Sequence, residues 1–223
     1  MEADYLTLNR DVVEQFPWAE PLAFYCHAVL RNLGWNVDPS RSGQGTGLNS
    51  VLFTSPMPAQ GVTTIASTTA LIAASDPFCK TLYLDFSAVP QARSRLKSTS
   101  HQDPPPILLG RHLEQTALAS LDYLWIARAN AIRSNTRRKL ALKQVWDAYD
   151  LILIDWPSSM PRAWLEHVAP LASVALVIAG GEASKAQVNR LASSLMRQGI
   201  ANVGVIINQD ARHPNQSNQG GSR

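Results

Sequence analysis

Several features that would mark a special class of protein are scarce in this sequence. Its 223 residues include two cysteines, Cys26 and Cys79, and neither stands in a C-x-x-C pair. A disulfide framework and a cysteine-based zinc site are therefore excluded as the basis of the fold, and we expect free, buried thiols. The most apolar run, residues 171–179, is shorter than the ~20 residues that cross a bilayer. The N-terminus has early acidic residues and no apolar segment, unlike a secretory signal, so we expect a cytoplasmic protein.

Charge is also sparse. Charged residues make up 17% of the chain and apolar residues 45%, which excludes a disordered chain and allows a sizeable core. The net charge of +3 permits an anionic partner without requiring one. Six basic residues fall close together, namely Arg128, Arg133, Arg137, Arg138, Lys139 and Lys143. They form either a solvated helix face or a patch for an acidic partner. Few aromatic residues accompany them, which disfavours binding of single-stranded nucleic acid, and nothing indicates sequence-specific nucleic-acid recognition.

The pattern divides the chain into three parts. Residues 1–49 form an N-terminal polar segment with a helix over 20–33 and a flexible loop at 38–47. Residues 50–208 form an α/β domain, and residues 209–223 a disordered tail. Gly34 ends the first helix. The apolar face of that helix recurs at three- and four-residue steps: Leu22, Tyr25, Cys26, Val29, Leu30 and Leu33.

Short apolar strands alternate with longer helices in the main domain. The pattern predicts strands at 50–54, 81–86, 121–126, 151–155, 173–179 and 203–207, helices at 62–74, 136–148 and 182–198, and an exposed proline-rich loop at 87–105. Strands that are apolar on both faces must be covered on both sides, so we expect a three-layer, mostly parallel sheet flanked by helices. Ligands bind beyond the carboxyl ends of such strands, where Asp85 and Asp155 stand.

The first strand, turn and helix resemble a phosphate-binding loop. Such a loop follows the pattern G-x-x-x-x-G-K-[ST] and holds phosphates by backbone N–H groups and a helix N-terminus. Gly61 stands where the turn needs a permissive backbone, and Thr63 where a hydroxyl would hold Mg²⁺. Val62 occupies the lysine position. A lysine ~4 Å from a phosphate oxygen contributes about 4 kcal/mol at an effective dielectric near ~20, and valine contributes none.

Four segments in order resemble the cytoplasmic domain of bacterial tyrosine kinases of capsule and exopolysaccharide systems, within the MinD/ParA class of P-loop ATPases. Residues 54–64, TSPMPAQGVTT, are similar to the family's T-S-x-x-P-G-E-G-K-[ST]-T. Residues 82–87, LYLDFS, are similar to L-x-I-D-x-D. Residues 149–158, YDLILIDWPS, are similar to Y-D-x-[IV]-I-I-D-x-P-P, and residues 199–208, GIANVGVIIN, to G-x-x-V-x-G-V-[VI]-[IL]-N.

The resemblance implies a P-loop NTPase fold and a site for ATP and Mg²⁺. Gly61, Thr63, Thr64 and Asn208 would bind the nucleotide, with Asn208 near the adenine. Thr63, Asp85 and Asp155 would bind the metal. For the two acids, capping of a nearby helix or turn remains an alternative. For Thr63 and Thr64 the alternative is stabilisation of the helix N-terminus.

Departures from the family's pattern shape the functional prediction. Besides Val62, Ala59 replaces a loop glycine and Ser87 replaces the second acid after the second strand. The C-terminal segment 209–223 contains no tyrosine, although the family's substrate is a C-terminal tyrosine cluster. The family's E-x-x-R-x-x-R oligomerisation helix has lost both arginines in residues 20–26, EPLAFYC, so assembly by that route is not expected.

These departures predict a non-catalytic pseudo-ATPase of exopolysaccharide biosynthesis, with ATP and Mg²⁺ binding weak or lost. Its expected partner is the cytoplasmic end of a membrane polysaccharide chain-length or export protein, which would place it at the inner face of the membrane. The sequence also permits a homo-oligomer. One alternative is a weak ATPase or tyrosine kinase whose cation comes from Arg93, Arg95 or Lys97. Another is a MinD/ParA-like positioning factor that uses the basic residues at 128–143.

Overall fold

The protein is described here by a computed structural model. It describes residues 15–35, 49–87, 92, 96, 107–108, 111–126, 148–159, 165–166 and 168–208. The predicted loop at 38–47, the basic cluster at 128–143, the helix at 136–148 except its last residue, and the tail at 209–223 lie outside these residues. The same holds for Arg93, Arg95 and Lys97.

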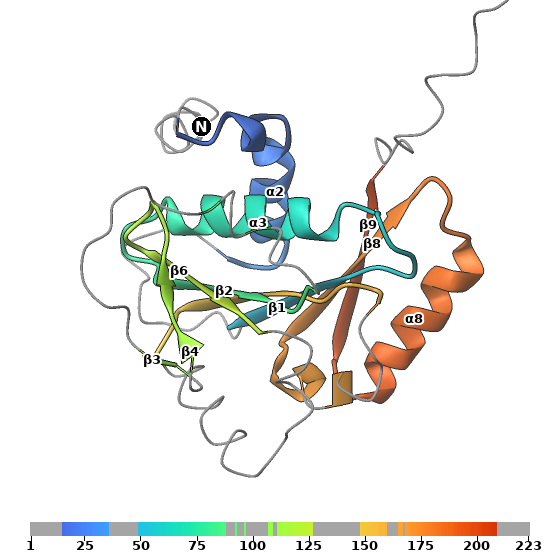
Figure 1. The fold of residues 1–223 in the computed structure, drawn as a ribbon. Helices are drawn as coiled ribbons and strands as arrows, with labels where there is room; N and C mark the ends of the chain where they lie inside the picture. Colours follow the sequence, from blue (N-terminus) through green and yellow to red (C-terminus); the bar gives the residue numbers. More distant parts are fainter. Residues whose placement is uncertain are drawn as a thin grey trace, which may run out of the picture.

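One seven-stranded sheet forms the centre of the domain (Figure 1). Its spatial order is β5 (Glu114–Gln115), β6 (Leu121–Trp125), β2 (Thr81–Asp85), β7 (Leu151–Asp155), β1 (Ser50–Thr54), β8 (Val174–Gly180) and β9 (Asn202–Asn208). Every pairing is parallel except that of β5 with β6. The mostly parallel sheet is therefore confirmed. The sequence pattern did not predict β5 or the small hairpin of β3 (Ile107–Leu108) and β4 (Arg111–His112).

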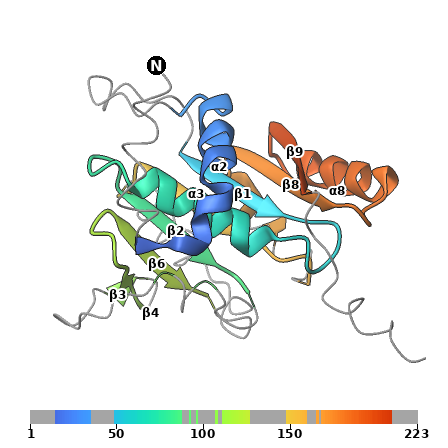
Figure 2. The same ribbon diagram turned by 90° about the horizontal axis from the view of Figure 1, so that it is seen from above.

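Helices cover the two faces of this sheet. On one face lies α3 (Val62–Ala74), with η1 (Pro17–Ala19) and α2 (Glu20–Asn32) packed over it (Figures 1 and 2). On the other lie α8 (Lys185–Arg197) and η3 (Ala169–Leu171). Each side forms its own apolar cluster because successive side chains of a strand point to opposite faces. The three-layer prediction is confirmed, and within the described residues no helix is long and apolar enough to cross a membrane.

Helix α3 is almost wholly buried although it is rich in hydroxyl groups. Thr68 donates to the carbonyl of Thr64 at 2.9 Å, and Thr69 to that of Ile65 at 2.7 Å. Ser67 also donates to the Thr64 carbonyl, at 3.2 Å. These bonds within the helix satisfy polar groups that would otherwise be buried without partners. They allow a helix of small side chains to lie close against the sheet.

Most predicted boundaries agree with the structure to within a residue or two, and Gly34 and Gly199 end their helices with φ of 83° and 99°. The cysteines Cys26 and Cys79 are free and buried, as expected.

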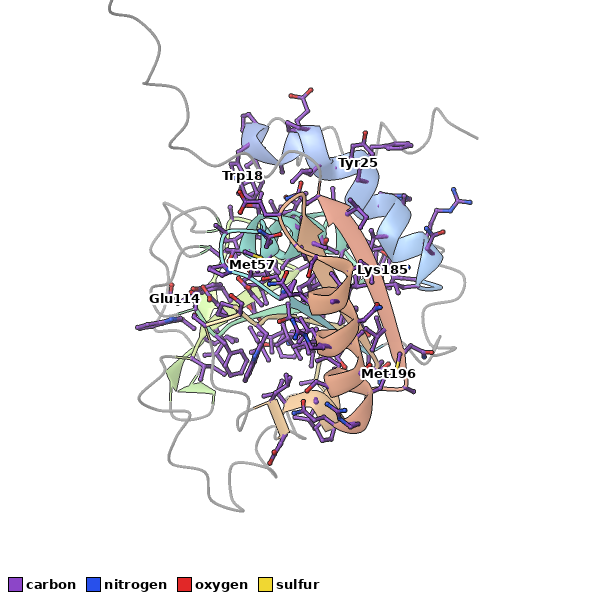
Figure 3. All side chains as sticks on the ribbon, turned by 90° about the vertical axis from the view of Figure 1, so that its right-hand side faces the viewer. Trp18, Tyr25, Met57, Glu114, Lys185 and Met196 are labelled. Carbon is purple, nitrogen blue, oxygen red and sulfur yellow. The ribbon has the colours of Figure 1, made fainter. Side chains whose placement is uncertain are left out.

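Three expectations are wrong: one concerns Tyr25, one the loop at 87–105 and one the last strand. Tyr25 does not join the apolar face of α2 but is 65% exposed and projects outward (Figure 3).

The expected exposure of the 87–105 loop is wrong at its described positions. Ser87, Ala92 and Leu96 are all buried. Ala92 and Leu96 belong to the apolar cluster on the α3 side of the sheet, and the Leu96 carbonyl accepts a hydrogen bond from the Ala117 N–H at 3.2 Å. The last strand, β9, is apolar but is not covered on both sides, since it lies at the edge of the sheet.

Candidate functional site

The loop between β1 and α3 adopts the backbone that a phosphate-binding loop requires. Gly61 precedes α3 with φ of 86°, and a Cβ there would lie 2.6 Å from Nδ2 of Asn208, so both backbone and space require glycine. Ala59, which stands where the resemblance places a glycine, has φ of 60°, in the left-handed region. For alanine this conformation costs about 1–2 kcal/mol. The loop shape is therefore kept although one glycine is lost.

Polar contacts join this loop to the ends of the two neighbouring strands. The buried Gln60 side chain accepts a hydrogen bond through Oε1 from the N–H of Gly180, the last residue of β8. Asn208, the last residue of β9, donates from Nδ2 to the Gln60 carbonyl at 3.0 Å. Asn208 thus lies against the loop beside Gly61, as a nucleotide-site residue should, but its amide is engaged by the loop itself.

The two predicted strand-end acids lie side by side. Asp85 and Asp155 are paired in register on the adjacent strands β2 and β7, and both are completely buried. Each carboxyl group accepts a hydrogen bond from a tyrosine hydroxyl. Tyr83 donates to Asp155 Oδ2 at 2.9 Å, and Tyr123 donates to Asp85 Oδ2 at 2.8 Å. Each tyrosine lies on the strand next to its acid, and the two rings stack at 6.0 Å.

The remaining carboxylate oxygens differ in their contacts. Asp85 Oδ1 accepts from the N–H of Ser87 at 2.8 Å, which is the turn-capping contact that was the alternative reading of this residue. Asp155 Oδ1 is buried with no hydrogen-bond partner in the described part of the chain. Thr63, in the first turn of α3, interacts with the Asp155 carboxylate closely enough to lower its pKa.

Burial sets the charge state of Asp155. Its pKa is raised from 3.8 to about 7, chiefly by loss of solvent and then by the nearby Asp85, while hydrogen bonds from Thr63 and Tyr83 limit the rise. Burial also raises the pKa of Tyr83 well above 10, and the two acids reinforce this. The phenol therefore remains a hydrogen-bond donor at every physiological pH.

The lysine position is occupied by an apolar side chain. Val62 is 7% exposed and belongs to the apolar cluster beneath α2 and α3. No described contact brings a lysine or arginine to Asp85, Asp155 or the loop at residues 54–61. The groups that this loop offers an anion include its backbone N–H groups and the N-terminus of α3.

The structure brings together most of the predicted site residues. Thr63 and Asp155 meet, Asp85 lies next to them, and Gly61 and Asn208 are in contact. For Thr64, the structure shows hydrogen bonds from the hydroxyls of Ser67 and Thr68 to its backbone carbonyl within α3. Sequence reasoning missed Tyr83, Tyr123 and Gln60. The two-residue spacing of Tyr83 from Asp85 places both on one face of a strand and could have indicated the first.

The residues present fit the expected metal better than the expected triphosphate. A threonine hydroxyl and a buried carboxylate oxygen without a partner are the oxygen donors that Mg²⁺ prefers. For the phosphates, the loop backbone has the right form but Val62 supplies no charge. The groups that would hold Mg²⁺ are Thr63 and Asp155, with Asp85 engaged by Tyr123 and Ser87.

Solved structures with this fold include kinase domains and cell-division ATPases. The kinase domain of the Escherichia coli tyrosine kinase ETK is 22% identical, with a TM-score of 0.57, covering 73% of this chain and 68% of its own. The VpsO kinase domain is 17% identical, with a TM-score of 0.60, covering 90% and 98%. MinD from Aquifex aeolicus is 21% identical, with a TM-score of 0.50, covering 72% and 69%. No protein-family model and no curated protein matches the chain.

Proposed function

The chain has the fold shared by bacterial tyrosine kinase domains and MinD/ParA ATPases, and on that basis we propose that it acts by binding rather than by phosphoryl transfer. In this proposal it is a cytoplasmic, non-catalytic component or regulator of exopolysaccharide biosynthesis or export. The observation that carries the proposal is Val62, which is packed in the core at the position of the phosphate-binding lysine.

The electrostatics of the site support a role in binding rather than in phosphoryl transfer. Phosphoryl transfer requires neutralisation of the charge that develops on the transferred group. The site holds two fully buried carboxyl groups, and no contact among the described residues brings a cation to it. The tyrosine hydroxyls instead bind carboxylate oxygens that a catalytic metal site would use. Such an arrangement stabilises the fold without a ligand, as a protein whose nucleotide site has become structural would need.

The first test restores the missing charge. Val62→Lys should tighten binding of Mg-ATP by about tenfold or more, because a lysine near the phosphates contributes up to about 4 kcal/mol. Val62→Met is the matched control, since it adds length without charge and should bind as the unchanged chain does. Isothermal titration measures the affinities, and release of phosphate measures turnover. Turnover of ATP by the unchanged chain, abolished by Asp155→Asn, would contradict the proposal.

The proposed partner is the cytoplasmic end of a membrane polysaccharide chain-length or export protein. Support comes from the four segments that resemble the exopolysaccharide tyrosine kinases and from the shared fold. Co-expression with such a membrane protein, followed by detergent extraction and affinity capture, should recover a complex without added nucleotide. Recovery that depends on ATP, or no recovery at all, would argue against binding as the function.

A weak ATPase or kinase is the second candidate. The observation that favours it is the unpartnered Asp155 Oδ1 beside Thr63, since those are the oxygens a metal would use. It needs a cation from elsewhere, and Arg93, Arg95 and Lys97 are the candidates from the sequence. Their simultaneous replacement by glutamine should then abolish turnover, whereas on the first proposal there is no turnover to lose.

A further inference from the structure

The strand β9 forms one edge of the central sheet. It pairs in parallel with β8 over all seven of its residues, and among the described residues it has no neighbour on its other side. An edge strand presents a row of backbone N–H and C=O groups that another strand can bind. Figure 3 shows β9 along the outside of the molecule, beside α8.

The side chains of β9 do not protect this edge. Proteins usually guard an edge strand with lysine, proline or a bulge, but residues 202–208 read NVGVIIN, without charge or proline. Val205 is 47% exposed and Ile207 is 65% exposed. Both lie on the face of the strand that carries Val203, which packs against the cluster below α8. The exposed apolar side chains therefore extend a buried surface that continues under α8.

The same seven residues are complementary to themselves. When the strand is laid antiparallel on a second copy about Val205, similar residues face one another. The pairs are Asn202 with Asn208, Val203 with Ile207, Gly204 with Ile206, and Val205 with Val205. β-Branched side chains directly opposite one another are favourable pairs in antiparallel sheets. Both copies would use the same surface, as a two-fold symmetric interface requires.

From this edge we infer that the protein forms a symmetric dimer in which two β9 strands pair antiparallel. The sheets of the two copies then continue into one another. Because the two-fold axis is perpendicular to the sheet, both α8 helices lie on the same side of the seam, flanking Val205 and Ile207. The absence of charge along the strand means that no like charges oppose one another in this arrangement.

The size of the seam predicts its strength. Seven residues at ~3.4 Å each give a contact about 24 Å long. A contact one strand wide and about 24 Å long is small beside the ~1,600 Å² of a standard stable interface. We therefore expect a reversible dimer whose population depends on protein concentration. This inference does not rest on the proposed function, because Val205 is not part of the nucleotide-type site.

The experiment places a charge on the two-fold axis. Sedimentation velocity over a wide concentration range should show the unchanged chain moving from the 24.4 kDa of one copy to twice that mass. Val205→Lys should weaken association by about tenfold or more, because two like charges then lie directly opposite. Tyr25→Lys is the matched control: it puts the same charge in place of a side chain that is 65% exposed on α2, and it should leave association unchanged.

A mixture of Val205→Lys and Val205→Glu chains provides the second measurement. Each variant alone should associate more weakly than the unchanged chain, and the mixture should associate more tightly than either variant because opposite charges then meet at the axis. Circular dichroism of each variant shows that it is folded. A monomer of the unchanged chain at every concentration, or a Val205→Lys chain that dimerises as tightly as the unchanged chain, would overturn the inference. If a chain ending at Asn208 dimerises while the full chain does not, residues 209–223 cover the edge of β9 in the full chain. The inference that a second copy binds this edge would then be wrong.

Discussion

Replacement of Asp155 by asparagine should make the folded protein more stable at alkaline pH. The carboxyl is fully buried and its pKa is about 7, compared with 3.8 for an exposed aspartate. Each unit of that pKa difference corresponds to about 1.4 kcal/mol of folding free energy. Ionisation of Asp155 therefore destabilises the folded chain by about 4 kcal/mol at pH 8. Asparagine has nearly the same shape, carries no charge, and keeps an oxygen that can accept from Tyr83.

The pH dependence follows from the direction of the pKa change. Between about pH 4 and 7 the folded chain holds a proton on Asp155 that the unfolded chain has released. The contribution of Asp155 to stability is therefore greatest below pH 4 and declines as the pH rises through 7. The free energy of unfolding, measured by urea denaturation, should diverge between the unchanged chain and the Asp155→Asn variant over that range. Above pH 8 the gap should stay constant.

Asp122→Asn on β6 is the control for this measurement. It makes the same chemical change at a carboxyl group that is only partly buried and accepts a hydrogen bond from Tyr149 at 2.7 Å, so it shows which part of the effect is specific to Asp155. The reasoning would be refuted if Asp155→Asn lowered stability equally at pH 5 and pH 8. That result would mean that Asp155 is ionised in the folded chain and paired with a cation.

Two further substitutions test the contacts around the site. Tyr83→Phe removes the hydrogen bond to Asp155 and should lower the free energy of unfolding by about 1–3 kcal/mol in urea denaturation, because the buried acceptor loses its donor. Tyr149→Phe is its control, since that hydroxyl donates to the only partly buried Asp122 at 2.7 Å, and an equal loss there would argue against a special role for Tyr83. Ala59→Gly should raise thermal stability by about 1 kcal/mol, since glycine adopts the φ of 60° without strain. No gain on calorimetry would mean that the loop relaxes around alanine.

Local sequence patterns were sufficient to predict most of the fold. The buried strands β1, β2, β7 and β8 are mostly apolar, with polar residues near the ends of all but β8, and a strand covered on both faces is expected to be rich in apolar residues. The predicted helix at 62–74 is the observed α3, because its start is marked by Gly61 and its length by a run of small and apolar residues. The short strand β5 could not be predicted, since two residues carry no periodicity.

The candidate site was predictable in part. The strand ends locate Asp85 and Asp155, and the turn locates Gly61 and Thr63, because these positions depend on where each element ends. The hydrogen bonds of Tyr83 to Asp155 and of Tyr123 to Asp85 were not predictable, since they depend on which strands are neighbours. The same is true of Asn208, whose contact with the Gln60 carbonyl joins residues 148 positions apart.

The sequence alone determined the chemical content of this protein: an apolar parallel sheet, two acids at strand ends, and valine where a phosphate-binding loop carries lysine. These follow from side-chain identity and local spacing, which need no knowledge of distant residues. The tertiary structure alone decided that tyrosines meet the acids, and that the apolar strand β9 lies at an open edge rather than within the sheet. Strand order and register bring about both results, because they depend on how segments far apart in the chain pack together.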